Sequence, residues 1–140
     1  ISGQALLQRP NAKGGLGEAA YIAARSRARR LAGPEGIDAA LKAQQLDVLV
    51  APTAGPAWLT DHKVGDHFPG AGYGAAAVAG YPTLTIPMGH SDGLPLGIVF
   101  MGPAWSEARL IALGYDYEQR TRARKPPEYW PSLPPRTTRR

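Results

Sequence analysis

Two Asp-His pairs, Asp61-His62 and Asp66-His67, carry residue types that could hold a metal ion. Carboxylate oxygens and imidazole nitrogens are zinc ligands, and two such pairs five residues apart could supply four of them. The pairs lie in a Gly/Pro-rich stretch, however, with no helix to fix an i, i+4 geometry and no obvious further ligand. We therefore interpret them as part of a solvated loop, with a cavity rim and a metal site as the alternatives, and predict no metal.

Two other motifs have a structural interpretation that is stronger than the chemical one. His90, Ser91 and Asp92 are the residue types of a hydrolase triad, but three consecutive residues in a turn cannot point at one another as base, nucleophile and orienting group. The segment "GAGYG" at 70–74 lacks the next glycine of a dinucleotide site and the Lys-Ser/Thr pair of a phosphate loop. We predict a polar hairpin turn and close backbone packing, respectively.

Large aromatic residues are the better candidates for binding, because they stand in expected loops or at the starts of expected elements. They are Trp58, Phe68, Tyr73 and Trp105. Each either lines a substrate cavity or takes part in ordinary packing. Trp105 is the strongest candidate, since it directly follows an expected strand end. We predict Trp105, Met101, Phe68 and Tyr73 as substrate-binding residues.

The elements that must position these residues alternate between helix and strand. Apolar stripes and caps predict helices over 16–31, 34–44 and 71–80, with Gly33-Pro34 ending the first and a last helix beginning near Ser106. Apolar runs predict strands over 46–53, 83–88 and 96–101, and Asp92-Gly93 supplies a turn between the last two. A loop of about 15 to 20 residues follows the first strand, and loops of that length are usually functional or disordered.

This order predicts an α/β fold with a mixed β-sheet flanked by helices. Helix-strand-helix-strand order favours parallel neighbours, and the hairpin adds one antiparallel pair. The run Val48 to Val50 does not alternate, which suits a strand covered on both faces. Pro82, Pro87 and Pro95 each stand at an expected strand boundary, where the missing N–H is tolerated. Three such strands are too few to cover one another, so we expect them to belong to a larger sheet.

Composition and charge exclude several classes of protein and of binding partner. The chain has no cysteine, which excludes disulfides and is compatible with a cytoplasmic location, and no run approaches a membrane span. The net charge of +5 resides at the end: residues 120–140 carry +6 and the remainder −1. Cations at a helix C-terminus complement its dipole, so we predict no nucleic-acid binding and a Pro/Arg-rich tail over 126–140. The chain begins at Ile1 within a helix-like stretch, so we expect residues to precede it.

Together the motifs "LDVLVAPT", "AGYPTLTIPMG", "DGLPLGIVFMG" and "AWSEARLIALGYDYEQRT" resemble the C-terminal third of amidase signature enzymes. The resemblance covers about 16–125, so we predict that 1–125 is the C-terminal portion of an amidase signature domain. The segment "DHFPGAGYGAAAVAGYP" is similar in wording to bacterial peptide amidases and cyclic-amide hydrolases. The resemblance implies hydrolysis of carbon–nitrogen amide bonds through a serine acyl-enzyme, without cofactor, on small amides or peptide amides.

The catalytic residues that the resemblance implies, two serines and a lysine, belong to a Gly/Ser-rich stretch upstream of this third. The five serines here do not lie in such a run, and none of the four lysines is near a plausible nucleophile. We therefore assign no catalytic residue to this chain and expect it to be inactive alone, supplying sheet and cavity wall to the remainder of the amidase fold. The amidotransferase subunit of the same family and a non-catalytic binding or structural module are the alternatives. Homo-oligomerisation stays open.

Overall fold

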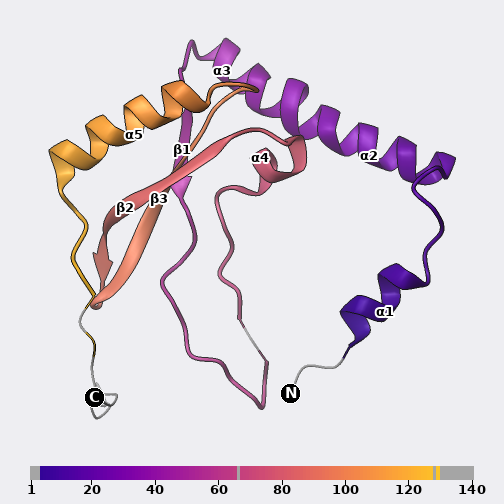
Figure 1. Cartoon of the computed structure of the whole chain (residues 1–140), viewed down its shortest axis with the longest axis horizontal. Coiled ribbons are helices and arrows are strands. Elements are labelled where there is room, and N and C mark those ends of the chain that lie inside the picture. The colour runs from indigo at the N-terminus through magenta and orange to yellow at the C-terminus, as the bar shows by residue number, and fades with distance from the viewer. Residues whose placement is uncertain (1–3, 66, 128, 130–140) are drawn as a thin grey trace.

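The computed structural model describes residues 4–65, 67–127 and 129. Its helices and strands follow the predicted order, and Figure 1 shows α5, α3 and α2 along the upper part of the view with the sheet below α5 and α3. In chain order the elements are α1 (Ala5–Asn11), α2 (Ala19–Ala32), the π-helix η1 (Gly33–Asp38), α3 (Ala39–Ala43), β1 (Leu49–Pro52), α4 (Gly74–Ala79), β2 (Thr83–Ser91), β3 (Leu94–Met101) and α5 (Glu107–Thr121). No helix within this described part is long and apolar enough to cross a membrane.

The first two predicted helices form one continuous helical run. Gly33-Pro34 does not end the first helix, because η1 carries the chain through the proline as a π-helix and leads directly into α3. Proline in an α-helix removes one hydrogen bond and crowds the preceding turn. A π-turn is wider than an α-turn, so it accommodates that crowding. The prediction of a helix end at Gly33-Pro34 is therefore wrong.

The sheet has the strand order β1-β3-β2, and both pairs are antiparallel. The predicted hairpin between β2 and β3 is confirmed, and Asp92 and Gly93 both have positive φ, as a tight two-residue turn requires. The expected parallel neighbours are not found in the described part of the chain. β1 and β2 run in the same direction, but the hairpin folds β3 back between them.

One proline lies inside a strand rather than at its boundary. β2 extends to Ser91, so Pro87 falls in its middle, where the pairing register with β3 shifts between Pro87 and Gly89. A bulge on a strand at the side of a sheet is a position that tolerates the missing N–H. Pro87 therefore marks a register shift within β2, and the prediction that it stands at a strand boundary is wrong.

Helices cover both faces of the sheet, and β3 contributes to both cores. Val99 and Met101 point into one cluster with residues of η1, α3 and α4, and Phe100 points into another beneath α5. The first cluster consists of Ile37, Leu41, Ala76, Val99 and Met101; the second consists of Ile86, Phe100 and Leu110. Strand β3 is therefore covered on both faces. The two-sided burial predicted for the run 48–50 is wrong at Val50, which is 55% exposed beside Phe100 at the edge of the α5 face.

Candidate functional site

The predicted substrate-binding residues lie at two opposite ends of the sheet. Met101 and Trp105 are at the end where β3 passes into α5, and Phe68 and Tyr73 belong to the connection between β1 and α4. Figure 1 shows that this connection extends away from the end at which α3 and α5 meet. The structure therefore does not bring the four predicted residues together in one site.

Trp105 stands almost fully in solvent in a strained backbone conformation. Its side chain is 92% exposed, and its φ of 65° lies in the left-handed region that bulky residues rarely adopt. The next residue, Ser106, donates a hydrogen bond from Oγ to the Pro103 carbonyl oxygen at 2.7 Å and fixes the turn. Met101, by contrast, is buried in the core cluster with Val99. In the described chain Met101 packs the sheet, and Trp105 projects from its end.

An open groove of about 550 Å³ lies beside this turn, between the end of α3 and the start of α5. Arg109 and Asp47 form an ion pair across it at 2.6 Å. Asp38, which also lines the groove, accepts a hydrogen bond from the Tyr81 hydroxyl at Oδ2, at 2.6 Å, and this contact with the carboxylate raises the pKa of the Tyr81 phenol. The other Asp38 oxygen is buried without a hydrogen-bond partner among the described residues. These groups tie η1 to the segment that enters β2.

The second end of the sheet carries a shallower cleft of about 370 Å³, built from small residues of the β1–α4 connection. Its base is tied to the sheet, since the Gly72 N–H donates to the Thr53 carbonyl oxygen at 3.1 Å and Ala54 pairs with Ala71. The Phe68 ring packs at a tilt on another aromatic of the same loop, Trp58, with centroids 5.9 Å apart. Tyr73 follows the cleft directly in the chain and is 41% exposed.

The sequence interpretation missed a pair of threonines near this cleft. Thr53, just beyond β1, and Thr85, in β2, bring their Oγ1 atoms to 3.4 Å from each other. Their signal is the alternation Thr83-Leu84-Thr85-Ile86, which is typical of a strand with one apolar and one polar face. The surrounding apolar run concealed that alternation.

Within the described residues, both polar motifs lie in or beside turns. Asp61 accepts hydrogen bonds from the N–H groups of Lys63 and Val64, which close a turn and lower the pKa of its carboxyl group. Asp66 lies outside the described residues, and among those that are described no three acidic or histidine side chains could hold a metal ion. His90 and Ser91 end β2 at the predicted hairpin turn.

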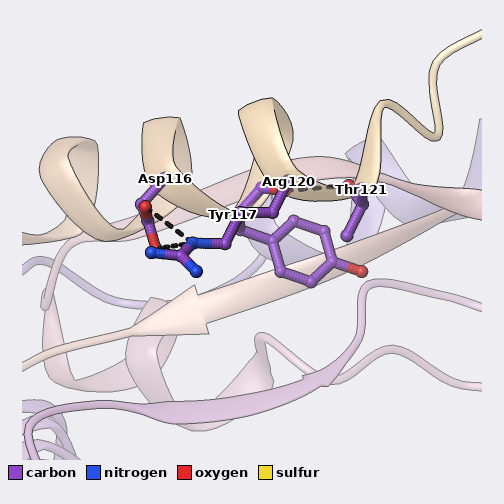
Figure 2. Close-up of polar contacts among 4 residues, drawn as sticks. All are labelled: Asp116, Tyr117, Arg120 and Thr121. Carbon is purple, nitrogen blue, oxygen red and sulfur yellow. Dashed lines mark hydrogen bonds and ion pairs between the residues drawn. The ribbon is translucent and has the colours of Figure 1, made fainter.

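The basic end of α5 is partly neutralised within the helix. Figure 2 shows Arg120 Nε donating a bifurcated hydrogen bond to the two carboxylate oxygens of Asp116, at 2.9 and 2.8 Å, and the hydrogen bond from the Thr121 hydroxyl to the Tyr117 carbonyl oxygen. Exposed ion pairs of this kind contribute little to stability. Most of the predicted tail, residues 128 and 130–140, lies outside the described part of the chain.

Comparison with known proteins places these features in one family. A family model described as Amidase matches residues 5–111. A peptide amidase solved with the competitive inhibitor chymostatin is 65% identical, with a TM-score of 0.86, over 91% of this chain and 26% of that one. The native peptide amidase from Stenotrophomonas maltophilia is 63% identical, with a TM-score of 0.82, over the same shares. The chain thus spans about a quarter of these solved relatives.

A second kind of relative is more distant. A glutamyl-tRNA(Gln) amidotransferase subunit from Azotobacter vinelandii is 36% identical over 85 residues, which is 56% of this chain and 17% of that protein. The matched segment is therefore shorter and less similar than the one shared with the peptide amidases.

Proposed function

This chain belongs to the amidase family, and from that premise we propose that it forms the C-terminal portion of an amide hydrolase of the peptide-amidase kind. The observation that carries the proposal is the 65% identity to a peptide amidase over 91% of the chain. The proposed reaction cleaves the carbon–nitrogen bond of a peptide C-terminal amide through a serine acyl-enzyme. Cyclic or linear amides of small amino acids are the second substrate class.

In this proposal the chain positions the site and the catalytic groups come from elsewhere. A serine nucleophile, a second serine and a lysine, as the family resemblance implies, would precede this portion and donate the nucleophile and the proton relay. The residues of this chain would exclude water and orient the substrate. The β1–α4 connection and the Trp105 turn would form two walls, with Phe68, Tyr73 and Trp105 as the aromatic contacts and Met101 supporting the second wall from the core.

Apolar side chains on α5 and β1 are exposed and require a partner that covers them. Ile111 and Tyr115 are 61% and 65% exposed one helical turn apart on α5, and Val50 is 55% exposed on β1. Exposed apolar patches and unpaired strand edges of this kind mark interaction surfaces. The remainder of the amidase fold is the proposed partner for both. A second copy of the chain is the other occupant that the experiment below distinguishes.

A chimera tests the proposal. This chain would replace the matching quarter of the Stenotrophomonas maltophilia peptide amidase, and ammonia release from peptide C-terminal amides would be measured. We expect turnover by the monomeric chimera, because nearly two thirds of the exchanged residues are identical. The matched control is the unexchanged enzyme. A folded chimera that hydrolyses no amide contradicts the proposal, and stable self-association of the chain through Ile111 and Tyr115 assigns that surface to a second copy.

Two further outcomes separate the alternatives. The 140-residue chain alone should hydrolyse no amide, and turnover that Ser91→Ala or Ser106→Ala abolishes would place the catalytic groups within it. Glutamine hydrolysis by the chimera in preference to peptide amides would favour the amidotransferase alternative. Binding of an amide without turnover in the complete protein would favour the non-catalytic module.

A further inference from the structure

Strand β2 has one covered face and one open face. Leu84 and Ile86 pack beneath α5 in the second core cluster. Thr83 and Thr85 alternate with them, so they point to the other face, where both are exposed. The helix nearest in sequence, α4, packs against α2 and η1 instead of covering β2. A polar strip is therefore left open on a sheet whose other positions are largely apolar.

On this open face, residues from β2, β3 and the end of β1 meet at one polar contact between two threonines. The Oγ1 atoms of Thr53 and Thr85 lie 3.4 Å apart, on either side of Gly97 in the central strand β3. A Cβ at Gly97 would come within 2.9 Å of both Thr53 Oγ1 and Thr85 Cγ2, so only glycine lets the two side chains meet there. Glycine inside a strand often marks a place where a ligand or another backbone approaches closely.

Thr53 is held in place by its backbone. Its N–H donates to the Gly97 carbonyl oxygen at 2.7 Å, and its own carbonyl oxygen accepts from the Gly72 N–H at 3.1 Å. The second of these bonds joins it to the cleft of the β1–α4 connection. The threonine pair, Thr53 and Thr85, thus lies on a fixed frame beside the proposed cavity wall.

The pair has hydrogen-bonding capacity that its own contact does not use. An ordinary O–H···O bond is about 2.5 to 3.0 Å long, so the 3.4 Å contact is weak. Each hydroxyl donates one hydrogen bond and accepts up to two. A peptide group, which offers one N–H and one C=O, is complementary to two adjacent hydroxyls.

We propose that the threonine pair binds the peptide group on the acyl side of the amide that is cleaved, and so selects peptide amides over simple aliphatic amides. This inference rests on the proposed amide-hydrolase function. Thr53 and Thr85 are then specificity residues of the cavity, one donating to the substrate carbonyl oxygen and the other accepting from its N–H. They take no part in bond cleavage.

Two substrates of matched carbon skeleton test the inference in the chimera. N-acetyl-L-leucinamide has a second peptide group, and 4-methylpentanamide is the same amide without it. Thr53→Val and Thr85→Val remove one hydroxyl each. We expect each to lower kcat/KM for N-acetyl-L-leucinamide by about tenfold, the size of one well-placed hydrogen bond, and for 4-methylpentanamide by less than about twofold.

Serine variants and a distant threonine supply the controls. Thr53→Ser and Thr85→Ser keep the hydroxyl and should retain the preference for the peptide amide. Thr121→Val removes a hydroxyl from the end of α5, on the other side of the sheet, and should leave both rates unchanged. Equal losses on the two substrates, or a lower melting temperature with an unaltered preference, would make the pair a packing contact and overturn the inference.

Equilibrium binding separates this inference from the proposed function. If the unsubstituted chimera turns over neither amide, the proposed function is contradicted. Titration with N-acetyl-L-leucinamide still measures whether the threonine pair contributes to binding of a peptide group. A Kd about tenfold weaker in Thr85→Val than in the unsubstituted chimera supports the threonine pair as a peptide-group site. An unchanged Kd, or no binding to the unsubstituted chimera, overturns it.

Discussion

The two faces of the sheet differ in how completely helices cover them. On the α5 face, Leu110 packs with Ile86 of β2 and Phe100 of β3, and the buried members of that cluster are all apolar. On the opposite face, η1, α3 and α4 close over β1 and β3, while β2 presents Thr83 and Thr85 to solvent. Strand β2 thus contributes to a core on one side and presents an accessible polar surface on the other. Stability should depend on the first and recognition on the second.

The close approach of α5 explains why it covers this face of β2. Gly114 lies where a Cβ would come within 2.5 Å of Leu84 Cδ2 and of Ile86 Cδ1. The absence of a side chain lets the helix backbone approach β2 directly, and no comparable helix lies above the threonines in the described part of the chain. Coverage of β2 is therefore decided by the placement of α5.

The largest expected effect is on the closed face. Leu110 is 2% exposed, so Leu110→Ala should lower the free energy of unfolding by about 2 to 5 kcal/mol through lost burial and a residual cavity. Urea unfolding of the chain measures it. Thr85→Val, on the open face, should change the same quantity by less than about 0.5 kcal/mol. Comparable losses in the two variants would contradict the contrast between the faces.

An intermediate effect on stability is expected at the contact between η1 and the segment that precedes β2. Tyr81→Phe removes the 2.6 Å hydrogen bond to Asp38 and should cost roughly 1 kcal/mol at neutral pH. That hydrogen bond to the carboxylate raises the Tyr81 pKa above its ordinary value of 10.0 in the folded chain. Its contribution is therefore complete below that ordinary pKa and is lost as the pH rises through the folded value.

The measurement is the difference in free energy of unfolding between wild type and Tyr81→Phe as a function of pH. The difference should stay constant below about pH 9 and shrink above about pH 10, as the phenol of the wild type ionises. Tyr115→Phe, which removes an exposed phenol on α5, is the matched control and should show no such dependence. A difference that grows with alkaline pH would show that Asp38 does not stabilise the neutral phenol.

Much of the fold could be predicted from local signals. The hairpin followed from the turn residues Asp92-Gly93 between two apolar runs, and α5 followed from the capping position of Ser106 and its apolar spacing. The strand order could not be predicted in this way, because the pairing of β1 with β3 depends on contacts between residues distant in sequence, which no local pattern encodes. The π-helix at Pro34 was missed because proline ordinarily ends a helix.

The candidate site was less predictable for a related reason. Aromatic type and loop position made Phe68 and Trp105 candidates, but the sequence could not show that an antiparallel β3 carries Trp105 to the end of the sheet away from the β1–α4 connection. Burial of Met101 in the core follows from the same pairing, which sets it opposite Leu49 and Thr83. The threonine pair could not be predicted, because it depends on the register that sets Thr85 opposite Val99 and so brings its side chain, with that of Thr53, beside Gly97.

The smallest expected effect on stability concerns Trp105, at the end of the sheet rather than on a face. A side chain that is 92% exposed contributes little burial, so Trp105→Ala should change the free energy of unfolding by less than about 0.5 kcal/mol. The backbone matters more: at a φ of 65° glycine is unstrained, so Trp105→Gly should be more stable than Trp105→Ala by about 1 kcal/mol.

A tryptophan at a strained, exposed position without a packing role is explained if it contacts substrate in the complete enzyme. In the chimera, Trp105→Ala should therefore change the ratio of kcat/KM between amides with large and small acyl groups, while the melting temperature stays within a degree or so of the parent. Strong destabilisation of the chimera with unaltered relative rates would instead assign Trp105 to packing against the remainder of the fold, and the wall of the cavity would then be left to the β1–α4 connection and the open face of β2.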